Sequence, residues 1–220
     1  MMKTVLFALA ILAAATAPHQ LRDGATPQEV AAALQRKYDG IRDFSSDFVQ
    51  RHEGGLLGRK REERGTVLVK KPGMMRWRYT SPEEKLFISD GSDIYFYVPA
   101  NNQVTVSRVP TGEQAAAVQF LTGRGNLMRD FDVKFAEGGG SETYALRLTP
   151  KQPQNDYDWL EIVVDRKSLQ INRLTAGERD GSRSTFMFTG LKENVGLADK
   201  TFKFTIPRGA EVVHVGSGKR

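Results

Sequence analysis

The sequence predicts a mainly β fold of the α+β class: an antiparallel meander of about 11–12 strands that curls into a barrel or half-barrel, with helical pieces on its concave apolar face. Two observations predict this fold. From residue 44 onward, apolar and polar residues alternate over short segments, and Gly, Pro, Asn or Asp marks nearly every junction. Two other segments have the spacing or composition of helices. Because strands twist, a sheet this long must curl or split, and its apolar faces should converge on the inside.

The chain has 220 residues, 40% hydrophobic and 26% charged, which suits one globular domain or at most two small ones. We divide it into a signal peptide (1–17), a linker (18–25), a single domain (26–215) and a tail (216–220). The signal peptide is indicated by Lys3, by an apolar run over residues 5–15, and by small residues that suit cleavage after Ala15 or Ala17. The alternative, a transmembrane anchor, requires about 20 apolar residues, and this run is too short.

Cysteine is absent from the chain. We therefore expect neither disulfides nor a cysteine-linked lipid anchor, and a mature protein that is exported, soluble and free. Lys and Arg outnumber Asp and Glu by 32 to 26, and the charges are intermingled. This modest excess suits a basic surface that meets anionic headgroups or an acidic partner, and the absence of a basic-aromatic recognition motif argues against nucleic acid.

The first predicted element is an amphipathic helix that begins at Thr26 and ends near Gly40. Thr26 suits the cap position, Pro27 the first turn, and Glu29 completes a capping box. One apolar stripe recurs at helical steps, formed by Val30, Ala33, Leu34, Tyr38 and Ile41. The helix could bind a membrane, but its polar face mixes acids and bases, which favours packing onto a sheet.

The segments predicted as strands are 44–52, 61–70, 74–79, 85–89, 93–98, 103–109, 131–135, 143–149, 159–165, 169–176, 184–189 and 201–206. In the last of them, Phe202, Phe204 and Ile206 should share one face. A second helix is predicted over 111–121, which is Ala-rich, and Leu127 with Met128 forms an apolar patch after it. These helical pieces suit a plug or a lid.

The most informative stretch runs from Lys70 to Tyr79. After a Pro-Gly turn, Met75, Trp77 and Tyr79 should share one face of a strand, with Arg76 and Arg78 on the other. The apolar face is large and soft. We interpret it as part of a concave surface that holds something other than the protein's own core, although the simpler alternative is that these residues are only core.

No catalytic, metal or cofactor site is predicted. The three histidines, His19, His52 and His214, are not at metal-ligand spacing. There is no G-x-S-x-G elbow, no P-loop and no dinucleotide fingerprint. The carboxylates at Glu83, Glu84, Asp90 and Asp93 have ordinary turn composition. We therefore expect no enzyme.

The order and spacing of several motifs resemble a known family. The motifs are Phe48-Val49-Gln50, Gly65, the stretch from Lys70 to Tyr79, Ser89-Asp90-Gly91, Tyr95-Phe96-Tyr97, Pro99, Phe202-Lys203-Phe204 and Pro207. Together they resemble the periplasmic outer-membrane lipoprotein carrier (LolA) family. The resemblance implies an unclosed β-barrel with lid helices over a hydrophobic cavity. It also implies a periplasmic monomer that takes lipid-modified proteins from an inner-membrane lipoprotein-releasing ABC transporter and delivers them to an outer-membrane receptor.

On this resemblance, the acyl cavity is expected to be lined by Met75, Trp77, Tyr79, Leu86, Ile88, Phe96, Met128 and Phe188. Many family members carry arginine where this chain has Lys71, and that arginine is thought to hold the lid shut by bonding to the lid helices. Lys71 lacks the planar fork of arginine, so the latch could be looser, or Lys71 could simply be solvated. The alternative function is a related fold used as a regulatory or envelope-stress sensing module that binds a protein partner. The outer-membrane receptor resembles this fold too, but the missing lipidation cysteine argues against it.

Overall fold

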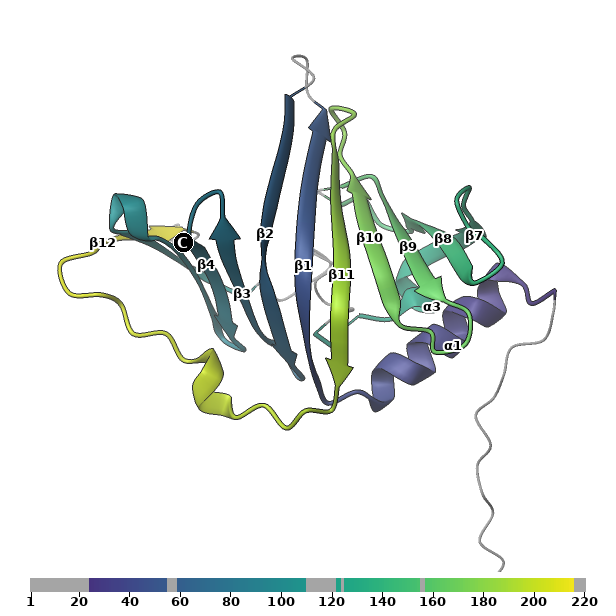
Figure 1. Ribbon diagram of the computed structural model, residues 1–220, viewed down its shortest axis with the longest axis horizontal. Coiled ribbons are helices and arrows are strands. Elements are labelled where there is room, and N and C mark those ends of the chain that lie inside the picture. Colours follow the sequence, from purple (N-terminus) through teal and green to yellow (C-terminus); the bar gives the residue numbers. More distant parts are fainter. Residues whose placement is uncertain (1–23, 55–58, 110–121, 124, 155–156, 216–220) are drawn as a thin grey trace, which may run out of the picture.

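The structure is a computed structural model that describes residues 24–54, 59–109, 122–123, 125–154 and 157–215. Its main feature is one twelve-stranded sheet in the order β12-β6-β5-β4-β3-β2-β1-β11-β10-β9-β8-β7 (Figure 1). Neighbouring strands are antiparallel except β12 and β6, which are parallel. The terminal strands of the sheet, β12 and β7, do not pair with each other, so the curled sheet is unclosed. The predicted mainly β, unclosed architecture is confirmed.

The strands are β1 (Asp43–Gly54), β2 (Arg59–Lys70), β3 (Met74–Ser81), β4 (Lys85–Asp90), β5 (Asp93–Val98), β6 (Gln103–Arg108), β7 (Phe131–Phe135), β8 (Thr143–Pro150), β9 (Trp159–Asp165), β10 (Ile171–Gly177), β11 (Arg183–Glu193) and β12 (Glu211–Val215). Each of the first eleven predicted segments overlaps one of them. A 3₁₀ helix, η1 (Pro99–Asn101), connects β5 and β6. The described residues between β6 and β7 also lie outside the sheet.

The predicted strand over 201–206 is wrong. This region begins with a 3₁₀ helix, η2 (Asp199–Phe202), and continues without strand pairing until β12 starts at Glu211. Phe202 and Phe204 alternate for a different reason, which is that both anchor an extended segment on the surface of the sheet. Phe202 is fully buried whereas Ile206 is 38% exposed, so the three alternating residues do not share one buried face.

Helix α1 (Pro27–Gly40) forms as its capping signals predict. The Thr26 hydroxyl accepts from the Glu29 amide at 3.3 Å, and the Glu29 carboxylate accepts from the Thr26 amide at 2.7 Å. A short helix, α3 (Leu127–Asp130), is capped by the Asn126 side chain, which accepts from the amides of Met128 and Arg129. The helix predicted over 111–121 lies outside the described residues.

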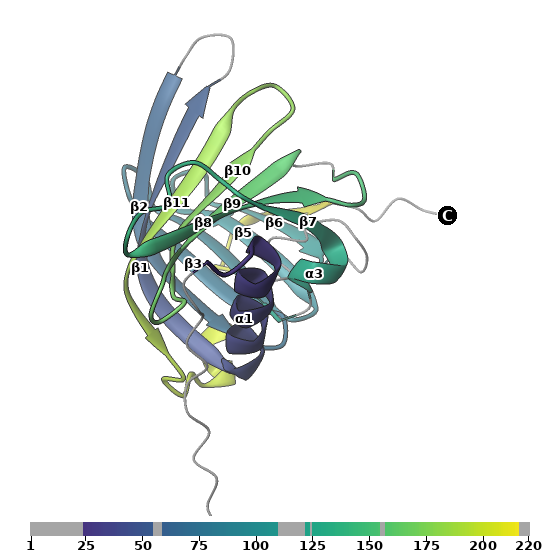
Figure 2. The same cartoon turned by 90° about the vertical axis from the view of Figure 1, so that its right-hand side faces the viewer.

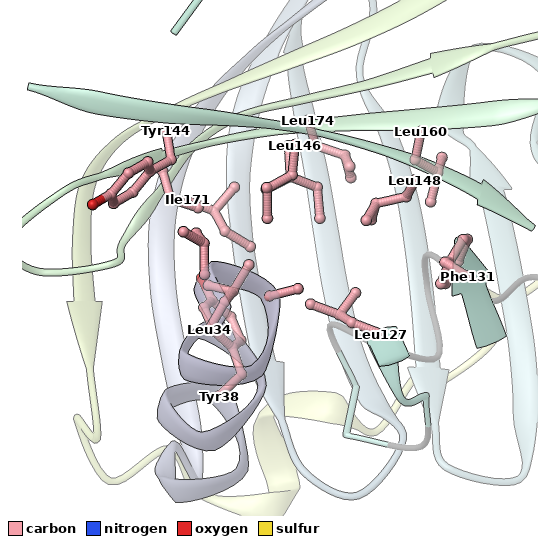
Figure 3. Close-up of a cluster of buried hydrophobic side chains, with 14 of the residues drawn as sticks. Leu34, Tyr38, Leu127, Phe131, Tyr144, Leu146, Leu148, Leu160, Ile171 and Leu174 are labelled. Atoms are coloured by element: carbon pink, nitrogen blue, oxygen red, sulfur yellow. The ribbon is translucent and has the colours of Figure 1, made fainter. Parts of the chain in front are cut away.

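The face of the sheet against which α1 packs is called here the inner face. Figure 2 shows the sheet curving around α1, which lies on its concave side. Leu34 and Tyr38 of α1 and Leu127 of α3 meet the buried leucines of β8 and β9, as Figure 3 shows. The apolar stripe of α1 is therefore buried against the sheet, and the prediction that it packs there is confirmed.

The opposite, outer face has a second and smaller core over β3 to β6. Residues 194–210, called here the C-terminal strap, run from the end of β11 to β12 (Figure 1), and η2 contacts β3 and β4. Ile88 and Val104 on this face are fully buried, as is Phe202 of the strap. The ring of Phe204 lies 5.4 Å from that of Tyr95. The strap thus buries the apolar side chains that the outer face presents.

Polar contacts hold the strap at its start and in its middle, and strand pairing holds its end. The Asp43 carboxylate accepts from the amides of Gly196 and Leu197, at 3.1 and 3.2 Å. Farther along, the Arg76 guanidinium donates to the Thr201 carbonyl at 3.1 Å. The strap then ends in β12, which pairs along β6. Arg76 therefore points to the outer face, as its alternation with Trp77 predicts.

Candidate functional site

Five aromatic side chains from three strands meet on the inner face: Phe48 of β1, Trp77 and Tyr79 of β3, and Phe186 and Phe188 of β11. We call this group the aromatic wall. The Phe48 ring lies 5.0 Å from the rings of both Trp77 and Tyr79, in edge-to-face geometry. Trp77 lies 5.2 Å from Phe186 and 6.3 Å from Phe188. Such edge-to-face pairs stabilise one another beyond their buried area.

Strand register explains why the wall forms. Phe48 is opposite Phe188 across β1 and β11, and Gly65 stands between Phe48 and Tyr79 in the β1-β2-β3 ladder. A Cβ at Gly65 would overlap the Arg78 carbonyl and approach the Phe48 ring to 3.0 Å. Only glycine leaves room there for Phe48 to reach across β2 and contact both β3 aromatics.

The two halves of the inner face differ in accessibility. Beneath α1, the leucines of β8 and β9 are buried to 2% exposure or less. By contrast, Trp77, Tyr79, Phe186 and Phe188 pack against the same cluster but are only partly buried. The aromatic wall therefore continues the protein's core into a surface that is apolar and incompletely covered. A partly covered apolar surface of this kind suits a hydrophobic ligand.

Most of the predicted site residues lie on this face. Trp77, Tyr79 and Phe188 belong to the wall, and Met75 lies beside them at 5% exposure. Met128, on α3, packs against the same cluster. Phe96 has the same orientation but is 37% exposed.

The placement of Leu86 and Ile88 in the cavity is wrong. Across β3 and β4, Trp77 is opposite Phe87, whereas Leu86 and Ile88 are opposite Arg78 and Arg76 and so point to the outer face. Their apolar character serves the small core under the C-terminal strap. Phe87 packs against the inner cluster and was missed, together with Phe48 and Phe186. Part of the signal is visible in the sequence, because β4 carries apolar residues in both alternation phases, and only its pairing with β3 shows which phase faces inward.

Lys71 lies where α1 ends. Its ammonium donates to the carbonyl of Tyr38, in the last turn of α1, and lies 5.6 Å from the centre of the Tyr38 ring. The side chain also passes close to Gly123, where an added Cβ would come within 2.5 Å of Lys71 Cδ. Burial lowers the pKa of Lys71 and the nearby Asp39 opposes that shift. Lys71 is therefore half-buried and bonded to a helix end, and the solvated alternative does not describe it.

A polar cluster lies beside the wall, at the end of the inner face away from Lys71. Lys85 donates to the Glu63 carboxylate at 2.5 Å, and Arg61 lies 2.8 Å from the same oxygen. The Lys85 ammonium sits 4.5 Å from the ring centre of Tyr79, and the Tyr79 hydroxyl donates to Gln50 at 2.9 Å. Burial raises the pKa of Tyr79 to about 12, and the negative charge of Glu63 adds to the effect.

Other kinds of site are not indicated in the part of the chain that the structure describes. No group of three or more His, Asp or Glu residues there is arranged to hold a metal ion. None of the described helices has both the length and the hydrophobicity to cross a membrane. A separate pocket of about 550 Å³ lies at the β7–β8 hairpin and contains none of the predicted site residues. Its lining includes Phe135, Tyr144, Arg166 and the three glycines 138–140.

Comparison with known proteins gives one family. Residues 39–205 match the family model described as outer membrane lipoprotein carrier protein LolA. The chain is similar to the outer-membrane lipoprotein carrier protein of Chromohalobacter salexigens, at 28% identity over 98% of this chain and 100% of that one. It is also 29% identical to the carrier protein of Cupriavidus taiwanensis, over 85% and 90% of the two chains. Among solved structures, an uncharacterized conserved protein from Thermus thermophilus has the same fold, with a TM-score of 0.54 at 13% identity, covering 85% of this chain and 98% of that one.

Proposed function

We propose, since this chain belongs to the LolA family of outer membrane lipoprotein carriers, that it binds the acyl chains of lipid-modified proteins on the aromatic wall and carries them through the periplasm. The family consists of carriers and not enzymes, in agreement with the sequence prediction. In the proposed route, the protein receives its cargo from an inner-membrane lipoprotein-releasing ABC transporter and gives it up to an outer-membrane receptor.

The observation that supports this proposal is the partial exposure of the aromatic wall. Hiding one acyl CH₂ from water stabilises it by about 0.8 kcal/mol, so a lipid anchor with several long chains does not cross an aqueous compartment uncovered. A surface of aromatic rings with Met75 and Met128 beside it makes contacts that have no fixed direction. Such a surface tolerates acyl chains of different length and releases them when a better site is offered.

A fluorescence titration tests the proposal. Delipidated protein is expected to bind a fluorescent fatty-acid probe saturably, and a triacylated lipopeptide is expected to displace it, whereas the same peptide without acyl chains is not. Mass spectrometry of protein purified from its native compartment should then detect co-purifying acylated peptides. A titration without saturation would contradict acyl binding, and saturable binding that acylated peptides do not displace would contradict the lipoprotein cargo.

We further propose that the bond from Lys71 to Tyr38 holds α1 against the sheet in the empty protein. This bond joins the start of the β2–β3 turn to the C-terminal turn of α1, where a cation is also favoured by the helix dipole. Opening the inner face for acyl chains then requires the bond to break. The lysine provides one point of attachment where an arginine would offer several.

Lys71→Met is expected to tighten acyl binding by about fivefold and to slow release, because the empty, closed state loses a bond that the loaded state does not use. Lys71→Arg restores the donor and should bind acyl chains no more tightly than the unchanged protein. The measurement is the dissociation constant and the off-rate of the fluorescent probe for each variant. Equal constants for all three proteins would exclude Lys71 as a latch.

A further inference from the structure

The polar cluster occupies an unusual place for charged groups. Lys85 is directly opposite Tyr79 in the β3–β4 ladder, and Glu63 lies two residues before Gly65 on β2, so both face the same side as Trp77. The Glu63 side chain is only 10% exposed and that of Lys85 only 14%. An ion pair in such surroundings is costly to desolvate, and apolar residues would fill the space as stably or more so. The fold alone therefore does not account for charges at this end of the wall.

The cluster has hydrogen-bond donors in excess. In the described part of the chain, the Lys85 ammonium donates only to Glu63 and rests on the Tyr79 ring, which leaves further N–H groups unused. Arg61 contacts the same carboxylate, and its other neighbour, the 64% exposed Glu83, is 4.0 Å away. The Tyr79 hydroxyl already donates to Gln50. A ligand that fits here brings oxygen acceptors and no donors of its own.

The cluster lies at one end of the aromatic wall, where the oxygen-bearing end of a bound acyl chain would lie. From Tyr79 to Met75 the inner face extends four residues along β3, or about 13 Å of apolar surface leading toward the α1 end. A hydrocarbon chain lying on the wall would have its carboxyl-derived end at one extremity of this surface. Among the described residues, Lys85 keeps unused donors beside the wall, whereas the Lys71 ammonium at the other end is engaged by Tyr38 in the empty protein, so an entering chain meets the donors of Lys85 first.

We infer that Lys85 and Arg61, held by Glu63, bind the ester carbonyl oxygens of a diacylglyceryl anchor and so orient its chains along the aromatic wall. This inference rests on the proposed function. The shared chemistry is an oxygen acceptor at the end of an acyl chain, which a free fatty-acid carboxylate also carries. The diester is the source proposed, because a carrier of lipid-modified proteins meets its acyl chains as esters of glycerol.

The test compares two synthetic lipopeptides: an S-dipalmitoylglyceryl-cysteine peptide and its diether analogue, which keeps both chains but lacks the carbonyls. The protein is expected to bind the diester about tenfold more tightly than the diether, as for hydrogen bonds from charged donors. In Lys85→Met/Glu63→Gln the preference for the diester should fall to about twofold or less, because only the half-exposed Arg61 then remains to donate. Arg78→Met is the matched control, because Arg78 lies on the outer face paired with Glu84 at 3.3 Å, and the preference should persist.

Each outcome distinguishes the inference from the function it rests on. Equal binding of diester and diether by the unchanged protein would overturn the inference while leaving the carrier function in place. Failure of both to bind saturably would instead contradict the carrier function. If the unchanged protein bound palmitate more tightly than the diester, and the double variant lost this affinity for palmitate, the cluster would be assigned to free fatty acids and the inference would be overturned. If the double variant does not fold, Arg61→Met, at a side chain 53% exposed, should still reduce the preference.

Discussion

Trp77→Glu is expected to weaken acyl binding by at least about 100-fold, because it replaces the central ring of the aromatic wall with a carboxylate that a bound chain would have to desolvate. Trp77 contacts Phe48, Phe186 and Phe188, so the substitution also removes the ring around which the other three are arranged. The measurement is the dissociation constant for the fluorescent fatty-acid probe, taken below the temperature at which the variant begins to unfold.

The adjacent residue gives a demanding control. Arg78→Glu changes the net charge by two units where Trp77→Glu changes it by one, but Arg78 is exposed on the outer face, beside Glu84. If total charge governed binding, the control would have the larger effect. We expect Arg78→Glu to leave the dissociation constant within about twofold, since an exposed charge is solvated and screened. Equal losses in the two variants would refute the assignment of the two faces.

The sequence alone was sufficient for the architecture, because strand alternation and capping are local properties. Eleven of the twelve predicted period-two segments, from 44–52 to 184–189, overlap strands, and the Thr26–Glu29 capping box predicts where α1 begins. The failure at 201–206 has a physical reason. Phe202 and Phe204 anchor an extended segment that crosses the outer face without pairing as a strand. A paired strand would show the same alternation of apolar residues, so period two does not distinguish the two arrangements.

The candidate site was predictable where one phase of a strand is apolar and the other charged. In β3 one phase is apolar and the other carries Arg76 and Arg78, so Met75, Trp77 and Tyr79 could be placed together on one face, which is the inner face of the sheet. In β4 both phases contain apolar residues, and the more uniform phase, Leu86 with Ile88, belongs to the outer face. Pairing between strands decides such cases, and it depends on contacts that are distant in the sequence. The same is true of Lys71, whose partner Tyr38 is contributed by α1.

The wrong strand at 201–206 and the wrong face for Leu86 and Ile88 have one origin. Over β4 to β6, both faces of the sheet carry apolar residues. Tyr95 and Tyr97 of β5 meet Phe204 on the outer face, while Phe96 between them points inward. An antiparallel sheet that exposed both faces would present a large apolar patch to water. The C-terminal strap covers one face with the chain's own residues. The other face is left partly open, and this asymmetry is the reason why we propose the inner face as the ligand-binding face.

Phe202→Ala is expected to lower the free energy of unfolding by about 3–5 kcal/mol, the loss typical of a fully buried phenylalanine replaced by alanine. Phe202 is the only residue of η2 that is buried, and η2 contacts β3 and β4, so the cavity would form against these strands on the outer face. Urea unfolding followed by circular dichroism measures the change. Phe204→Ala should cost less, about 1–2 kcal/mol, because that ring is only partly buried between Tyr95 and Tyr97.

The same variant separates stability from binding. Because Phe202 and the aromatic wall lie on opposite faces of the sheet, folded Phe202→Ala should bind the acyl probe within about twofold of the unchanged protein. Trp77→Glu should show the reverse, a large loss of binding with a smaller loss of stability. Weakened acyl binding in Phe202→Ala, measured where the variant is fully folded, would mean that the strap controls the inner face through β3 and β4. The C-terminal strap would then be part of the carrier's release mechanism and not only a cover for its outer face.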